Sequence, residues 1–241
     1  MSVSSQNKKV QVIAEIGYLV PNPMMYRNAT DENCVGYISE FFKDLQSTET
    51  VSARILNSKC TSLPYERVVE IFNHLDSSVS WKKVSDWEVE VEYTISHPEG
   101  DVVAVDTNTT RSATLTRRTV TKSCSGSCID SSFEISRVRY THIDQLDFNT
   151  SLYSSVRILK SKRFHYQTER SSWTFRVSLV WEGETKACAE KSNKKYLVFV
   201  ETNDVKVATT NPRYTAASFL EKVIDVMSVS GKRRDLKVES R

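Results

Sequence analysis

The sequence predicts a mainly β protein with flanking helices, an α+β chain whose antiparallel strands close into a barrel. Apolar and polar residues alternate over 87–95 and again over 173–181, and alternation with a period of two is typical of half-buried strands. Segments of this kind follow one another with few breaks. Closure of about eight such strands into a barrel removes the exposed edges that an open sheet would leave.

Strand-like segments recur along most of the chain. The turn-forming residues of 97–101, 123–130 and 182–183 separate several of them. Besides 87–95 and 173–181, we expect strands near 9–19, 102–106, 112–122, 133–142, 155–166, 195–201 and 204–209.

Three segments have helical spacing instead, with apolar residues every three or four positions. They predict helices near 35–46, 64–76 and 212–228. The last has the clearest start, because Asn211 can cap the helix and Pro212 suits its first turn. We expect one barrel domain over 1–230, followed by a flexible basic tail over 231–241.

Composition excludes some classes of protein. The 241 residues are 26% charged with a net charge of +3, which is ordinary for a globular chain and too small to indicate a nucleic-acid partner by itself. No apolar run approaches the roughly 20 residues that span a bilayer, so no membrane partner is expected. The N-terminus lacks a secretory signal. A soluble intracellular protein is expected, and the basic tail could be a nuclear-localisation or nucleic-acid patch, or simply a solvated end.

Charged residues on the predicted strands are the main candidates for function, because the sequence has no phosphate-binding glycine loop, G-x-S-x-G or H-E-x-x-H motif. Residues two apart share a face of a strand. Arg137 and Arg139 therefore form one basic pair and Lys160 and Lys162 another, with Arg163 on the opposite face from the second pair. Inside a barrel such rows would favour a polyphosphate, whereas on the outside they would be solvated.

Glu88, Glu90 and Glu92 form an acidic row of the same kind. Three carboxylates on one face suit Mg²⁺ or Mn²⁺, which favour oxygen ligands. The alternative is an outer face that opposes basic residues on a neighbouring strand. Spacing alone favours the outer face.

The order of these segments resembles the tunnel-shaped, metal-dependent RNA 5′-triphosphatases of mRNA capping. Lys9–Gly17 is similar to the family's first, glutamate-bearing strand, and Tyr65–Leu75 with Trp81 is similar to its helix and tryptophan. Lys195–Glu201 resembles the closing acidic strand. The remaining similar segments are the basic strands around Arg117–Arg118, Arg137–Arg139 and Lys160–Tyr166, and the strand Trp173–Ser178.

The resemblance implies hydrolysis of the γ-phosphate of nascent RNA with Mg²⁺ or Mn²⁺. It implies Glu15 and Glu201 as metal ligands. The residues that it implies for the phosphates are Arg137, Arg139, Lys160, Lys162 and Arg163 as catalytic groups, with Arg117 and Arg118 as further phosphate binders. Phosphate binding of this kind requires Arg137, Lys160 and Glu201 to converge on one cavity. The implied partners are triphosphate-ended RNA or a nucleoside triphosphate, with a guanylyltransferase or a transcription-complex subunit, and the implied location is the nucleus rather than the cytoplasm.

The sequence also departs from the family's pattern. Leu197 and Phe199 stand where the closing strand usually carries glutamates, and Arg176 stands where an aspartate is usual. Three interpretations follow. Glu88–Glu92 could supply the metal ligands. The protein could instead be an inactive relative that still binds RNA ends or polyphosphate through its basic rows. It could also be a non-catalytic subunit of a transcription or capping assembly, like the Mediator head subunits that share this kind of barrel.

Overall fold

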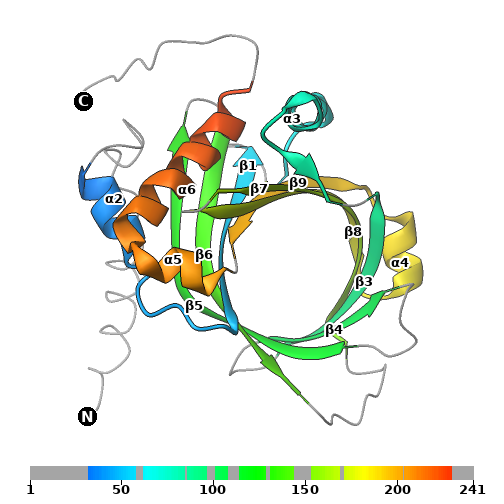
Figure 1. The fold of residues 1–241 in the computed structure, drawn as a ribbon. Coiled ribbons are helices and arrows are strands. Elements are labelled where there is room, and N and C mark those ends of the chain that lie inside the picture. The colour runs from blue at the N-terminus through cyan, green and yellow to red at the C-terminus, as the bar shows by residue number, and fades with distance from the viewer. Residues whose placement is uncertain are drawn as a thin grey trace, which may run out of the picture.

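The computed structural model describes residues 32–57, 62–84, 86–96, 101–107, 114–128, 131–143, 153–168, 171–202 and 204–229. Within them the predicted closed antiparallel barrel is confirmed, and Figure 1 shows it along its axis. The strands follow the ring order β7-β3-β4-β5-β6-β1-β9-β8, and β8 pairs back with β7 to close it. Their bounds are β1 Glu49–Asn57, β3 Glu88–Ile95, β4 Asp101–Thr107, β5 Thr114–Cys128, β6 Ser131–His142, β7 Ser155–Gln167, β8 Ser172–Gly183 and β9 Lys195–Thr202. The short β2 (Lys82–Lys83) pairs with the end of β7 beyond β3.

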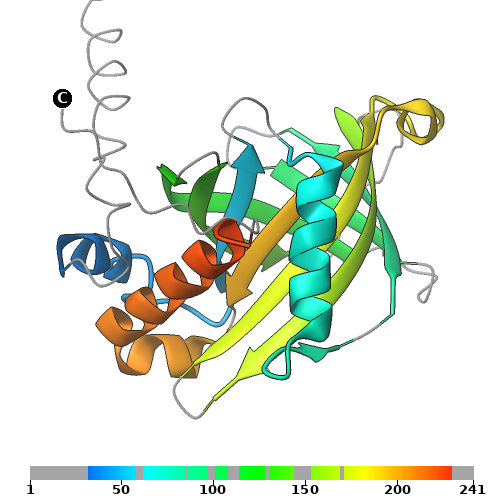
Figure 2. The ribbon, with the colours of Figure 1, turned by 90° about the horizontal axis from the view of Figure 1, so that it is seen from above.

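Helices cover part of the outer surface of the barrel (Figure 2). They are α2 Glu32–Ser39, α3 Tyr65–Ser77, α4 Lys186–Lys191, α5 Val205–Thr210 and α6 Pro212–Met227. The helices predicted near 64–76 and 212–228 have nearly these bounds. The one predicted over 35–46 begins at Glu32 and ends at Ser39.

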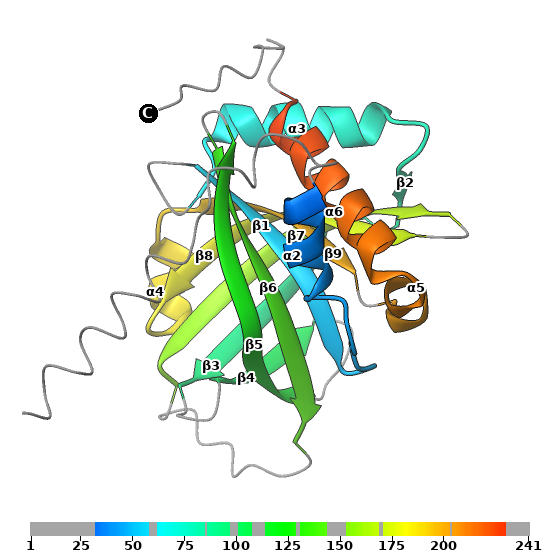
Figure 3. The same ribbon diagram turned by 90° about the vertical axis from the view of Figure 1, so that its left-hand side faces the viewer.

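The apolar face of the strands packs under these helices. Trp173 of β8 lies 5.4 Å from the ring of Phe219 in α6 and donates its Nε1–H to the Ser218 hydroxyl. Phe72 of α3 lies 5.7 Å from Phe164 of β7. These rings belong to one buried cluster that joins the barrel wall to α2, α3 and α6. Figure 3 shows α2 and α6 on the side of the barrel formed by β5, β6 and β1. The core therefore lies outside the barrel wall, and the opposite face of each strand lines the lumen.

Three sequence expectations need correction. Residues 123–128, expected to belong to a turn, form the end of β5. Residues 204–209 form α5 rather than a strand, because the Asp204 side chain accepts the Val207 N–H and caps a helix. The strand β1 was not predicted, although its alternation is regular: Val51, Ala53 and Ile55 are buried on the helix-covered face. The expected strand 9–19 and the tail 231–241 lie outside the described residues.

β1 is a strand of the ring that the resemblance to the tunnel family did not include. β1 pairs with β6 on one side and with β9 on the other, so it lies beside the closing strand. The resemblance gave Lys9–Gly17 as the first strand in the order of segments, and that segment lies outside the described residues. The described barrel closes without that segment.

Candidate functional site

The lumen carries paired arginines and glutamates. Strand register places residues opposite one another on the same face, and the acidic row of β3 faces inward against basic residues of β7 and β5. The Glu92 carboxylate, 6% exposed, accepts from Arg118 at 3.2 Å and from Arg157 at 3.4 Å. Glu90 accepts from Arg163 at 3.2 Å, and Glu88 pairs with the same guanidinium. The row thus opposes basic neighbours, as one interpretation held, but on the inner face.

Two further pairs lie on the other side of the lumen. Arg176 of β8 donates from Nη2 to Glu201 of β9 at 2.8 Å. Arg54 of β1 pairs with Glu134 of β6. Glutamates within the protein therefore offset part of the mutual repulsion expected of a basic lumen.

An apolar cluster fills another part of the lumen. Leu159, Val180 and Leu197 are at most 3% exposed and pack with Phe199. The Arg176 guanidinium lies 4.4 Å from the Phe199 ring centroid, within the range of a cation–π contact. Leu197 and Phe199 therefore pack in the lumen wall at the positions where the resemblance expects metal ligands.

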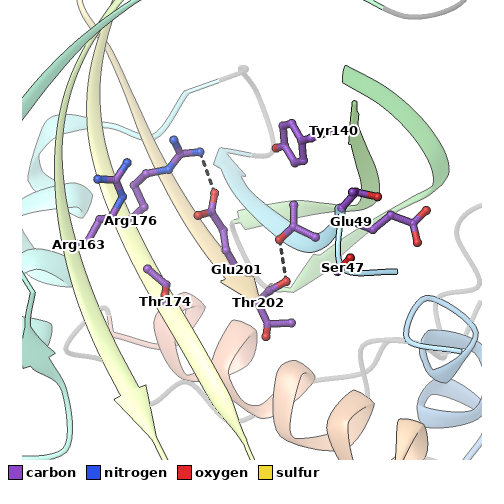
Figure 4. A pocket seen from close by; sticks show the side chains of 10 residues that line it. Ser47, Glu49, Tyr140, Arg163, Thr174, Arg176, Glu201 and Thr202 are labelled. Atoms are coloured by element: carbon purple, nitrogen blue, oxygen red, sulfur yellow. Dashed lines mark hydrogen bonds and ion pairs between the residues drawn. The ribbon is translucent and has the colours of Figure 1, made fainter. Parts of the chain in front are cut away.

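A pocket of about 400 Å³ opens at one mouth of the lumen (Figure 4). Its volume is within the usual range of small-ligand sites. Arg163, Arg176 and Glu201 lie together on one wall, with Thr174 beside them and Tyr140 opposite. The other lining residues are Ser47, Thr48, Glu49, Thr50 and Thr202.

The two arginines of the pocket are electrostatically coupled. Burial lowers the pKa of Arg163, and the positive charge of Arg176 lowers it further, with Glu201 acting in the opposite direction. Burial also works against the charge of Arg176, but Glu201 and Glu92 outweigh it and raise the pKa of that group. An anion between the two guanidiniums would relieve their repulsion.

One hydrogen-bond donor of Arg176 has no acceptor among the described residues. Its Nε–H is buried and makes no hydrogen bond to any atom of the described residues, and the same holds for Arg118 and Arg157. Buried donors without partners are uncommon in native proteins and indicate a missing ligand or water. Three arginines of the lumen are thus incompletely satisfied by the described part of the chain.

The predicted pair Arg137 and Arg139 lies on the outer face. Glu49, whose side chain points away from Arg176 and Glu201 in Figure 4, accepts from Arg137 at 2.6 and 3.1 Å and from Arg139 at 3.0 and 3.2 Å. Arg137 also donates to the carbonyls of Lys43 and Asp44 at 2.7 and 2.9 Å. These arginines therefore hold the chain between α2 and β1 in place.

Lys160 and Lys162 also lie on the outer face. Lys160 Nζ is 5.7 Å from the Trp87 ring centroid, and Lys162 Nζ is 4.9 Å from that of Phe72. The expected convergence of Arg137, Lys160 and Glu201 on one cavity is wrong, because only Glu201 faces the lumen. Phosphate binding cannot rest on that set of residues.

Other predicted residues divide between the two faces. Arg163 and Glu201 line the pocket. Arg118 is in register with the lumen-facing Tyr140, whereas its neighbour Arg117 has the opposite orientation. The prediction that Arg163 opposes the Lys160 and Lys162 face is confirmed by the pairing with β8. Glu15 lies outside the described residues.

The described lumen does not fit a divalent cation. The resemblance places metal ligands on the first and closing strands: the first-strand candidate Glu15 lies outside the described residues, and the closing strand β9 presents Leu197, Phe199 and Glu201. Glu201 is already paired with Arg176. Among the described residues, no group of three or more His, Cys, Asp or Glu side chains could hold a metal ion. Mg²⁺ or Mn²⁺ stays a prediction from the resemblance.

Sequence reasoning missed most of the pocket. Arg176 was noted only as a departure from the family's aspartate, although the alternation of 173–181 already placed it on the face opposite the buried Trp173 and Phe175. Tyr140 and Thr50 carried no comparable signal. They meet Arg176 through strand pairing between segments far apart in the sequence.

Comparison with known proteins supports the fold. No family model matches the sequence, and no curated protein matches it. The structure is similar to the RNA triphosphatase Pct1 of S. pombe, with a TM-score of 0.60 and 6% identity over 82% of this chain and 89% of that one. The same enzyme in complex with the Spt5 CTD gives 0.61 and 8% over 86% and 92%. The Mimivirus capping-enzyme triphosphatase gives 0.58 and 7% over 84% and 99%.

At these identities the likeness establishes a shared tunnel fold, as the order of segments predicted, and the activity is a separate question. No described helix is long and apolar enough to cross a membrane.

Proposed function

We propose that this protein binds the 5′-triphosphate end of RNA in the mouth pocket and does not hydrolyse it by a metal-dependent route. The observation that carries the proposal is the meeting of Arg163 and Arg176 in an open pocket of about 400 Å³. A triphosphate between them would relieve the repulsion of the two guanidiniums. Arginine suits this role because its planar group can donate two hydrogen bonds to one phosphate.

The donor set around the pocket supports binding more than catalysis. Arg163 and Arg176 are bound to Glu90 and Glu201, so the pocket keeps its shape without a ligand. Hydroxyls of Thr174 and Tyr140 face the same space (Figure 4) and add neutral donors. The carboxylates that a cation would need are replaced by Leu197 and Phe199 on β9. The proposal keeps the ligand of the inactive-relative interpretation but not its basic rows, because Arg137 and Lys160 lie on the outer face.

A place in a transcription or capping assembly also stays a proposal. The structure of the RNA triphosphatase Pct1 has been solved in complex with the Spt5 CTD. A similar partner here would give the tunnel fold a role that does not need the metal-binding glutamates. A guanylyltransferase partner and a nuclear location also stay predictions from the resemblance. The pocket itself supports only an anionic ligand between Arg163 and Arg176.

The binding test compares one RNA with a 5′-triphosphate, a 5′-monophosphate or a 5′-hydroxyl. We expect the triphosphate form to bind tightest. Arg176→Gln should weaken its binding by about 30-fold or more, since loss of one partner of a buried charge pair costs about 2–5 kcal/mol. The matched control is Arg54→Gln, which removes another lumen arginine that is paired with a glutamate but does not line the pocket. Equal binding of all three RNAs would refute the proposal.

A second assay tests the absence of hydrolysis. The folded protein is incubated with triphosphate-ended RNA and Mg²⁺ or Mn²⁺, and release of the γ-phosphate is measured. We expect no release above the level without protein. Metal-dependent release that disappears in Glu201→Ala would show an active triphosphatase and would contradict this part of the proposal.

A further inference from the structure

A basic and aromatic strip borders the mouth pocket where β2 lies against β7. We call Lys82, Lys83, Trp87 and Lys160 the rim strip. The three lysines are exposed and the Trp87 side chain is 38% exposed. The strip lies at the end of β7 and β3 that carries Arg163 and Glu88, and Phe72 of α3 covers one face of the Trp87 ring.

The strip is continuous with the pocket on its inner side. Lys82 is the register partner of His165, and His165 is the register partner of Thr174, which lines the pocket. The His165 Nδ1 and Thr174 Oγ1 atoms are 3.3 Å apart. Direct cross-strand partners have Cβ atoms about 5 Å apart. Lys82 is therefore separated from Thr174 in the pocket wall by one intervening strand position, that of His165.

The outer side of the strip combines a ring with positive charge. Trp87 stacks on Phe72 of α3, with centroids 5.9 Å apart and planes 9° from parallel. Lys160 Nζ lies 5.7 Å from the same ring. Aromatic rings beside basic side chains are what single-stranded nucleic acids bind, since bases stack on the rings and the cations contact the backbone.

The charges of the strip are only partly neutralised. Lys83 pairs with Asp86 at 2.8 Å, and the neighbouring Lys162 lies 3.9 Å from Asp76. Lys82 and Lys160 form no ion pair with any carboxylate of the described residues. Two exposed cations therefore remain for a polyanion.

We propose that the rim strip binds the single-stranded RNA chain that follows the 5′-triphosphate. This inference rests on the proposed function of the pocket. In this arrangement the triphosphate lies between Arg163 and Arg176, the next phosphates pass Lys82, and the chain leaves over Trp87 and Lys160. The ligand is thus RNA rather than a free nucleoside triphosphate, which would be too short to reach the outer side.

The test measures binding of two ligands to the full chain: a triphosphate-ended RNA of about ten nucleotides, within the usual size of a single-strand site, and GTP. The variant is the double substitution Lys82→Ala with Lys160→Ala. The control is Lys186→Ala with Lys191→Ala, which removes the same charge from exposed positions of α4. Thermal unfolding of both variants checks that the fold is intact.

We expect the rim variant to bind the RNA about tenfold more weakly and GTP as well as the wild type does. The slope of log affinity against log salt for the RNA should become shallower by about 1.4, since each phosphate contact on a single strand contributes about 0.7. The α4 variant should match the wild type in both ligands. A change of RNA affinity smaller than twofold in the rim variant would overturn the inference and would leave the strip to another kind of partner.

The remaining outcomes separate the two proposals. An equal loss of GTP and RNA binding would mean that the lysines act on the triphosphate, which overturns the rim inference and supports the pocket. A 5′-hydroxyl RNA that binds as tightly as the triphosphate form, and loses affinity in the rim variant, would support the rim inference as a chain-binding site and refute the proposed function of the pocket.

Discussion

The Oε2 atom of Glu49 lies 2.6 Å from Nη2 of Arg137, and the carboxylate is buried from solvent. Burial alone would raise the pKa of Glu49, but the hydrogen bonds from Arg137, the Gln46 N–H and Arg139 outweigh it and lower the pKa. The pair fixes the chain just before β1. Because Ser47 and Thr48 line the mouth pocket, this outer-face pair shapes the lip of the pocket.

Glu49→Gln should destabilise the protein strongly. The substitution leaves Arg137 buried without a countercharge, and breaking a buried pair in this way costs about 3–5 kcal/mol. Urea unfolding followed by circular dichroism measures the change. The control Glu182→Gln breaks the exposed pair with Lys195 and should cost less than about 1 kcal/mol. Equal effects of the two substitutions would contradict the assigned role of Glu49.

The same pair should make stability depend on pH in the acid range. Since the pKa of Glu49 is lower in the folded than in the unfolded chain, its contribution is complete above the unfolded value near 4.5 and is lost as pH falls through the folded value. We expect the free energy of unfolding to fall less steeply with acid in Glu49→Gln than in the wild type. Parallel curves for the two proteins would show that Glu49 does not titrate in this way.

Leu197→Ala tests the apolar cluster of the lumen. Leu197 is 3% exposed and packs with Leu159 and Val180, so truncation should cost about 2–5 kcal/mol. Val79→Ala, at a side chain that is 99% exposed, should change stability by no more than about 0.5 kcal/mol. If Leu197→Ala is as mild as Val79→Ala, the lumen is open where the structure has it filled.

Gly183→Ala tests how α4 sits on the end of β8. A Cβ at Gly183 would lie 2.6 Å from the Ala189 backbone nitrogen and 2.8 Å from the Cys188 carbonyl carbon, which are backbone atoms and cannot move independently. We expect a loss of at least about 1 kcal/mol. At Gly36 in α2 an added Cβ meets nothing within 4 Å, so Gly36→Ala should be neutral or stabilise by up to about 1 kcal/mol. Differential scanning calorimetry of both variants measures the contrast.

Local patterns predicted the barrel because alternation marks strands wherever one face is buried and the other is not. In both 87–95 and 173–181 the polar face lies in the lumen rather than in bulk solvent. Alternation tells which residues share a face but not which face is the inside. Lys160 and Arg163 illustrate this: the sequence separated them correctly, and only the packing of Phe72 and Trp87 against Lys162 and Lys160 shows that the lysines are outside.

The candidate site was harder to predict because its members come from distant strands. Arg163 and Glu201 were candidates by resemblance, whereas Arg176 joins them through pairing of β8 with β7 and β9. Glu49 was not considered, because a glutamate at the start of an unrecognised strand gives no local sign that two arginines about 90 residues later will surround it. Its partners are known only from the register of β1 with β6.

The closed ring of strands has a topological consequence. Backbone hydrogen bonds run from each strand to the next and from β8 back to β7, so the wall has no seam through which a chain could slip sideways. A nucleic acid would therefore reach Arg163 and Arg176 through the mouth of the barrel, where both arginines line the pocket. A covalently circular RNA of the same sequence has no 5′-triphosphate end, and it should fail to compete for the pocket even if it binds the rim.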